Sequence, residues 1–397
     1  MSDSPVPASS ESARVFGLDA LRAAAILGVT LAHGFAVLYP HVPNLGLLGH
    51  GGFYGVELFF VLSGFLIGQI LIRRGERLGH DGSLPEFYIR RWFRTLPLFW
   101  LLVIGNVVLD LVVQGTHYDS GLVWSHAFFL RNLTGPHLAF MPESWSLAVE
   151  EWFYLLFPAA LWLGLRLRGR FDAVLLVTAA AFYLFSTGVR MLAAGHPEAT
   201  WGEWERIVVI GRFDALMVGI LGAWLAMRFP SAWRRIAAPA AVVGMVLVVW
   251  MYVTLWRRDG GGFAAGADDF FARTWRFNLV SLGFALLLPA ASRWKLAREN
   301  FASTAVRKIA LWSYAMYLVQ HPLSRLIMPY WFTGWSTSAA QAWALFWVML
   351  AAIIGVSAAL HHGFEIHCTR LRDRVGPWLE RRLTRSQPKD QPSGPAV

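Results

Sequence analysis

The stretch FGLDALRAAAILGVTLAHGFAVLY, residues 16–39, decides the fold class, because it is largely apolar over a length that can cross a lipid bilayer. Three ionisable side chains interrupt it: Asp19, Arg22 and His33. Such side chains are costly at membrane depth and usually face the interior of a helical bundle. The stretch therefore predicts a membrane-spanning helix with a polar face.

The composition extends this prediction to the whole chain. Of 397 residues, 56% are hydrophobic and 15% are charged, and apolar stretches recur from end to end, which excludes an ordinary soluble domain. The predicted fold is an all-α polytopic membrane protein with about ten transmembrane helices. The expected spans are 15–38, 53–72, 95–113, 145–165, 172–190, 205–227, 236–256, 272–291, 309–330 and 339–362.

Basic residues cluster in alternate connections between these spans, which predicts that both chain termini are cytoplasmic. The clusters lie at 73–94, 166–170, 228–235 and 293–308, and again between 370 and 389. The other connections hold few basic residues, among them Arg131 and Arg190. This topology explains the net charge of +10 better than nucleic-acid binding does. The segment 115–144 is expected to be re-entrant or interfacial on the outer side.

Three regions are predicted. Residues 1–14 lack the features of a cleaved signal peptide and are expected to be a disordered cytoplasmic tail. Residues 15–365 form one membrane domain, in the cell inner (plasma) membrane, and residues 366–397 form a basic, partly disordered cytoplasmic tail. The single cysteine, Cys368, excludes an intramolecular disulfide. The sequence contains no motif typical of metal binding or of nucleoside triphosphate binding.

Arg22 and His33 are eleven residues apart, so on a helix they point within roughly 20° of each other and differ in depth by about 16 Å. Arg22 is expected near the cytoplasmic end, where Asp19 can pair with it, and His33 in the outer half. The plainer alternatives are an Arg22 that reaches the membrane surface and a His33 that only packs.

Two further stretches carry ionisable groups. Glu150, in PESWSLAVEEWFYLLFP, is expected at the depth of His33, where the two side chains could meet; the alternative is that a glutamate here only caps the helix. Arg90, Arg91 and Arg94, in EFYIRRWFRTLP, could bind phosphate and stack on a base. Anionic lipid headgroups or topology alone would also explain these arginines.

Six stretches in this order resemble the integral-membrane acyltransferase family 3, which includes surface-glycan O-acetylases. They are LDALR followed by His33 (R-x10-H), GVELFFVLSGFLIG, FYIRRWFRTLP, WSLAVEEWFY, RFDALMVG and SYAMYLVQHP. The chain departs from the family pattern at Glu57, where Asp is frequent, and at Gln320, where His is frequent and His321 follows.

The resemblance implies transfer of an acyl group, commonly acetyl, from cytoplasmic acyl-CoA to a hydroxyl of a carbohydrate or glycolipid, such as lipopolysaccharide or exopolysaccharide, at the outer side. It implicates Arg22, His33 and Glu150 in catalysis and Arg90, Arg91 and Arg94 in donor binding, without a metal. His33 would act as general base or acyl carrier, with Glu150 orienting it. Arg22 and Arg212 would offset negative charge. The further buried polar candidates are Asp19, Glu57, Ser63, Arg212 and His321.

The expected partners are acyl-CoA, the acceptor and the lipid bilayer, with a homo-oligomer left open and no nucleic acid. The alternative function is a transporter or flippase for a glycan or lipid carrier, in which the buried charges line the path. A non-catalytic membrane scaffold is a third alternative. Consumption of acyl-CoA separates the enzyme from both.

Overall fold

The computed structural model describes residues 15–42, 45–79, 83–136, 140–167, 169–196, 199, 201–258, 270–296, 298–330 and 338–373. Over these ranges the regular elements are all helical. The predicted tail 1–14 lies outside the described residues. Of the predicted tail 366–397, the part up to residue 373 continues a helix and the rest lies outside.

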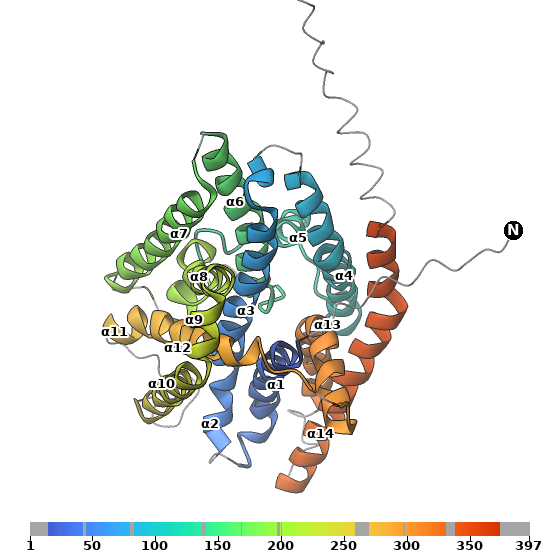
Figure 1. Cartoon of the computed structure of the whole chain (residues 1–397). Coiled ribbons are helices and arrows are strands. Elements are labelled where there is room, and N and C mark those ends of the chain that lie inside the picture. Colours follow the sequence, from blue (N-terminus) through green and yellow to red (C-terminus); the bar gives the residue numbers. More distant parts are fainter. Residues whose placement is uncertain are drawn as a thin grey trace, which may run out of the picture.

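Figure 1 shows the helices as a bundle in which α3 is central and α7, α10, α4 and α14 are peripheral. Their bounds are α1 (Phe16–Leu38), α2 (Gly46–Gly49), α3 (Gly51–Arg74), α4 (Ser83–Gln114), α5 (Ser120–Ala127), α6 (Ser144–Arg166), α7 (Phe171–Ala194), α8 (Asp214–Arg228), α9 (Pro230–Arg235), α10 (Ala237–Arg258), α11 (Phe270–Arg273), α12 (Trp275–Ala291), α13 (Phe301–Tyr330) and α14 (Ala339–Leu360).

Each of the ten predicted spans overlaps one of these helices. Within the described ranges, seven helices are long and apolar enough to cross a membrane: α1, α3, α4, α6, α7, α10 and α14. Helices α8 and α12 have 15 and 17 residues, fewer than the roughly 20 that a span usually needs. The chain is therefore a multi-pass helical membrane protein, whereas the count of ten and the orientation of the termini stay predictions.

The segment 115–144 contains α5, which has eight residues and is too short to span. The predicted span 205–227 is wrong at its start, because helix α8 begins only at Asp214. A π-helical turn at Trp201–Glu205 and a 3-10 turn at Val209–Gly211 precede it. Arg212 thus lies in a connection that is buried inside the bundle.

Arg190 also departs from its prediction. It was expected in an outer connection, but it lies on α7, is 1% exposed and pairs with Asp214 at 2.8 Å. A charge placed at a span boundary by hydropathy can equally point inward when a partner of opposite sign is available.

Helices α3 and α8 cross closely because each has a glycine at the contact. A Cβ atom on Gly64 would lie 2.0 Å from the carbonyl oxygen of Leu216, and one on Gly219 would lie 2.2 Å from that of Val61. Small residues allow such backbone contact between membrane helices. This crossing fixes the direction of α3, whose side chains reach the candidate site.

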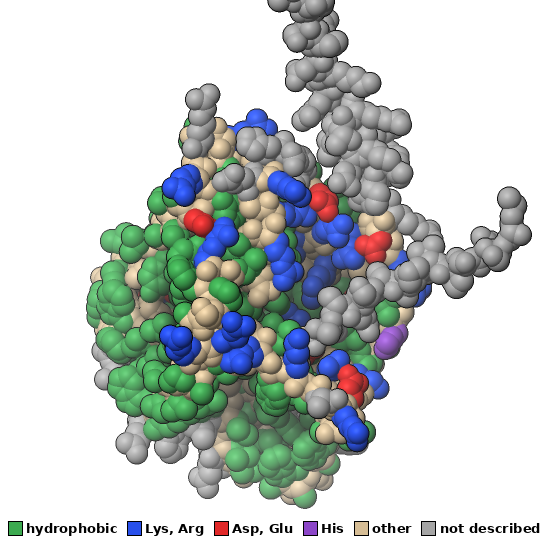
Figure 2. All heavy atoms as spheres, in the orientation of Figure 1, with side chains coloured by type: hydrophobic (Ala, Val, Ile, Leu, Met, Phe, Trp, Pro, Cys, Tyr) green, Lys and Arg blue, Asp and Glu red, His purple; other side chains and the backbone are tan. Residues whose placement is uncertain are grey.

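Large apolar side chains are exposed on the peripheral helices, for example Val177 and Leu192 of α7, which are 69% and 80% exposed. This pattern is expected of surfaces that face lipid. Figure 2 shows Lys and Arg side chains gathered on one face of the molecule, next to apolar areas. The positive-inside rule predicts that this basic face is the cytoplasmic one.

Candidate functional site

Two cavities lie against α1, α3, α6 and α13. The first, called here the basic cavity, has the polar lining residues Arg22, Ser63, Arg91, Arg94, Thr95, Ser146, Glu150, Tyr154, Ser313, Tyr314 and Tyr317. The second, the histidine cavity, has a volume of about 350 Å³, within the usual range of ligand sites. Its lining includes His33, Glu143, Trp145, Glu203, Arg206, Tyr317 and His321.

Helix periodicity brings the basic-cavity residues onto shared faces. Arg91, Arg94 and Thr95 follow the i, i+3, i+4 spacing on α4. Ser146, Glu150 and Tyr154 follow one another at four-residue intervals on α6. One face of each helix therefore supplies polar groups to the same space.

Arg91 is fixed in this cavity. Its guanidinium carbon lies 3.8 Å from the centre of the Tyr154 ring, and it donates a hydrogen bond to the Tyr154 hydroxyl. The Glu150 carboxylate lies 3.7 Å from the Arg91 guanidinium and accepts hydrogen bonds from Ser63 (2.5 Å) and Tyr154 (3.0 Å). Glu150 thus positions Arg91. Ser63, one of the predicted site candidates, donates a hydrogen bond to the same carboxylate.

The three predicted donor-binding arginines are not equivalent. Arg91 and Arg94 line the basic cavity together with Arg22. The Arg90 side chain is 60% exposed, pairs with Glu86 on its own helix at 2.6 Å, and is not among the lining residues. Adjacent residues on a helix point about 100° apart, so only one member of an Arg-Arg pair can face the cavity.

The histidine cavity brings His33 of α1 together with His321 of α13. The His321 Nδ1 atom lies 3.8 Å from the carboxylate of Glu143, which directly precedes α6. The Gln320 side chain lies beside His33. The spacing of Arg22 and His33 predicts one shared helix face at two depths, and in the structure Arg22 lines the basic cavity while His33 lines the histidine cavity.

Arg206 is a residue of this cavity that the sequence did not indicate. Its guanidinium carbon lies 5.5 Å from the ring centre of Trp145 and 5.9 Å from that of Trp201. Its Nε atom is buried without a hydrogen-bond partner, and no acidic side chain in the described part of the chain forms an ion pair with it. Within the described part of the chain, Arg206 therefore brings a guanidinium group to the histidine cavity without forming an ion pair.

The predicted contact between Glu150 and His33 is not formed. The two residues line different cavities, and Glu150 contacts Arg91, Ser63 and Tyr154 instead. Glu143 lies seven positions before Glu150, a rise of about 10 Å along the helix. Glu143, and not Glu150, therefore lines the cavity that contains His33.

Arg212 is not in either lining, which corrects its predicted role beside the reacting group. It forms a fully buried ion pair with Glu57, whose carboxylate also accepts a hydrogen bond from Ser281 (3.2 Å). Arg212 also donates to the backbone carbonyl oxygen of Arg206 (3.0 Å). The pair thus holds the connection that presents Arg206.

Asp19 is 4% exposed and is not among the lining residues of these two cavities. Within the described ranges, no group of three or more His, Cys, Asp or Glu side chains is arranged to hold a metal ion.

Comparison with known proteins shows which family this chain is similar to. The family described as an acyltransferase domain (acyltransferase family 3) matches residues 15–362. A Staphylococcus aureus protein named "Putative O-acetyltransferase" is 27% identical over 348 residues, covering 80% of this chain and 52% of that protein. Listeria monocytogenes peptidoglycan O-acetyltransferase OatA is 31% identical over 158 residues, covering 36% of this chain and 24% of its own length.

The chain spans about half the length of the first of these curated relatives, and no solved structure matches it significantly. The match to the family covers α1 to α14 and both cavities. The chain therefore belongs to the membrane acyltransferase family 3.

Proposed function

We propose that the protein is a membrane O-acyltransferase that moves an acetyl group from cytoplasmic acetyl-CoA to a hydroxyl of an envelope carbohydrate outside the inner membrane. The observation that carries the proposal is the pair of cavities on α1, one with three arginines and one with two histidines. A reaction whose donor and acceptor occupy opposite sides of a membrane needs two such sites.

The basic cavity suits the donor. Coenzyme A carries phosphate groups, which arginine binds through charge-assisted, bidentate hydrogen bonds. Arg22, Arg91 and Arg94 bring three guanidinium groups to one space, so we assign Arg22 to donor binding and not to the catalytic role that the family resemblance implies. With the nucleotide held here, the slender pantetheine arm would extend along α1 toward His33.

The histidine cavity suits the acceptor. His33 acts as general base: its imidazole takes the proton of the acceptor hydroxyl while that oxygen attacks the thioester carbonyl carbon. The tetrahedral intermediate then collapses, the carbon–sulfur bond breaks, and the departing thiolate takes the proton from the His33 imidazolium, which restores the base. Arg206 offsets the negative charge on the carbonyl oxygen in the intermediate. An alternative sequence, in which His33 carries the acyl group transiently, uses the same residues.

A carbohydrate acceptor is supported by the name of the Listeria relative, which acts on peptidoglycan. The indole of Trp145 provides an apolar surface in the cavity on which a sugar ring could stack. Lipopolysaccharide and exopolysaccharide remain proposed acceptors beside peptidoglycan.

The test uses the full chain in liposomes with radiolabelled acetyl-CoA and an oligosaccharide of N-acetylglucosamine and N-acetylmuramic acid. We expect thioester cleavage coupled to acetyl transfer, and His33→Ala to lower the rate by about 10²-fold to 10⁴-fold. His41→Ala, a histidine outside both linings, serves as the control. Full activity of His33→Ala would refute the mechanism, and glycan passage without thioester cleavage would support a transporter.

A further inference from the structure

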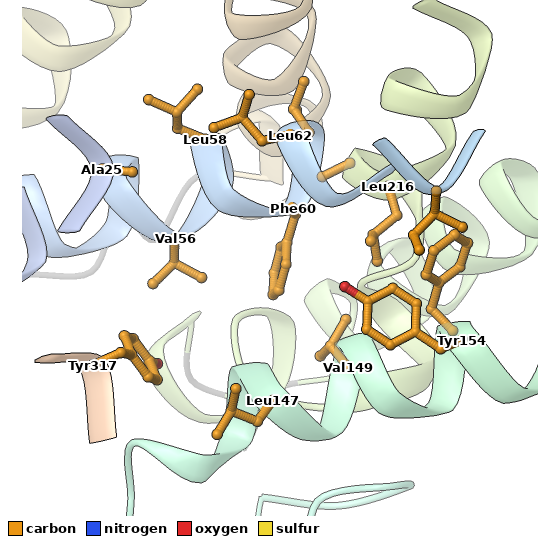
Figure 3. Close-up of a cluster of buried hydrophobic side chains, with 14 of the residues drawn as sticks. Ala25, Val56, Leu58, Phe60, Leu62, Leu147, Val149, Tyr154, Leu216 and Tyr317 are labelled. Atoms are coloured by element: carbon orange, nitrogen blue, oxygen red, sulfur yellow. The ribbon is translucent and has the colours of Figure 1, made fainter. Parts of the chain in front are cut away.

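Two residues, Val56 of α3 and Tyr317 of α13, line both cavities. They are only 4% and 7% exposed, so both are buried where the two cavities adjoin. Figure 3 shows their side chains facing the same space, with Phe60 of α3 and Leu147 of α6 close by. We call Val56 and Tyr317 the partition.

The Tyr317 side chain is held in place by two hydrogen bonds of its hydroxyl. Its hydroxyl shares a hydrogen bond with the Ser146 hydroxyl (2.6 Å) and donates to the backbone carbonyl oxygen of Glu143 (3.0 Å). Ser146 lines the basic cavity, and Glu143 lines the histidine cavity. A swing of the whole side chain about χ1 would move the hydroxyl and break these bonds, so the partition resists opening.

Val56 is also constrained. A β-branched side chain on a helix has essentially one χ1 rotamer, so Val56 cannot easily turn aside. The next residue, Glu57, is fully buried in its ion pair with Arg212, which fixes the backbone at this point. Both members of the partition therefore have defined positions.

The Val56 methyl groups and the Tyr317 ring are apolar, and the Tyr317 hydroxyl is occupied by its bonds to Ser146 and Glu143, whereas the cavities on either side carry charged side chains. Desolvation would exclude the phosphates of the donor and the hydroxyl-rich acceptor from this passage. A small neutral acyl group meets no such penalty, and its size is then limited by the Val56 methyl groups and the Tyr317 ring.

From this geometry, and relying on the function proposed above, we infer that Val56 and Tyr317 determine acyl-group specificity. The partition admits an acetyl group beyond the basic cavity and rejects longer chains. Among the described residues, Val56 and Tyr317 are the ones common to both linings, so this is the point at which the two residues can limit the size of the acyl group.

The test is a competition between acetyl-CoA and hexanoyl-CoA in the same liposomes, with both acylated products measured by mass spectrometry. Wild type is expected to favour acetyl, and Val56→Ala and Val56→Gly are expected to raise the hexanoyl-to-acetyl product ratio progressively, by about tenfold or more. Because the ratio is internal to each sample, partial loss of folded protein does not affect it.

Val61→Ala is the matched control, because Val61 is on the same helix, is fully buried and lines neither cavity; its ratio should equal that of wild type. Val56 variants that transfer acetyl with the wild-type ratio would overturn the inference. Absence of thioester cleavage from either donor would instead count against the proposed function.

Tyr317→Phe tests the hydroxyl separately, since it keeps the ring but removes both hydrogen bonds. We expect the hexanoyl-to-acetyl ratio to rise several-fold, and Tyr54→Phe, a buried tyrosine of α3 outside both linings, to leave it unchanged. An unchanged ratio in Tyr317→Phe would contradict the role of the hydroxyl bonds in fixing the partition.

Discussion

At the scale of single residues, the adjacent arginines Arg90 and Arg91 provide a direct comparison. Arg91 faces the basic cavity, where it contacts Glu150 and Tyr154, whereas Arg90 faces outward. We expect Arg91→Gln to raise the KM for acetyl-CoA about tenfold, the equivalent of one charge-assisted hydrogen bond of about 1.5 kcal/mol. Arg90→Gln should change it less than about twofold. Equal effects in steady-state assays would mean that neither arginine contacts the donor specifically.

Arg206 is the second residue whose role can be measured. If its charge stabilises the tetrahedral intermediate, Arg206→Gln should lower kcat by about 10²-fold, with a smaller change in the KM for the acceptor. Arg206→Lys should recover only part of the rate, because an ammonium lacks the planar guanidinium geometry. Arg131→Gln, a connection arginine outside both linings, is the control. A change confined to KM would instead assign Arg206 to acceptor binding.

At the scale of helices, the α3–α8 crossing has the clearest energetic prediction. Gly64→Ala and Gly219→Ala each place a methyl group within about 2 Å of a backbone oxygen, so the helices must separate. We expect each to destabilise the fold by about 1–3 kcal/mol, seen as a lower Tm in detergent.

Gly188→Ala on α7 is the matched control, because its Cβ would meet no atom within 4 Å. Alanine favours the helix more than glycine does, so this variant should keep or raise the Tm. A Tm for Gly64→Ala as high as that of Gly188→Ala would show that the crossing tolerates a wider separation.

The helices were largely predictable from sequence, because hydropathy and length report directly on the need to satisfy backbone groups in lipid. The spacing of Arg22 and His33 was predictable for the same local reason: both lie on one helix. Contacts between helices were not predictable from sequence, because the depth of each helix and its rotation about its own axis depend on how the helices pack. The expected meeting of Glu150 with His33 therefore failed, and Arg206, in a buried connection counted as part of a span, was missed.

At the scale of the whole molecule, the two cavities predict a sided reaction. In vesicles that hold the protein in one orientation, acetyl-CoA should support transfer only when it is added on the side of the basic face, with the acceptor on the other side. Orientation can be read from protease access to a C-terminal tag. Equal transfer with both substrates on the same side would contradict the assignment of the two cavities to opposite sides.

The partition also matters for the membrane in which the protein resides. A water-filled passage between the two faces would let protons and ions leak down the gradients that the membrane stores. The Tyr317 ring, bonded to Ser146 and Glu143, closes that passage while no acyl group occupies it. If the proposed function holds, the same ring would act as an electrical seal, so that a cytoplasmic donor could serve an acceptor outside the membrane without discharging the membrane potential.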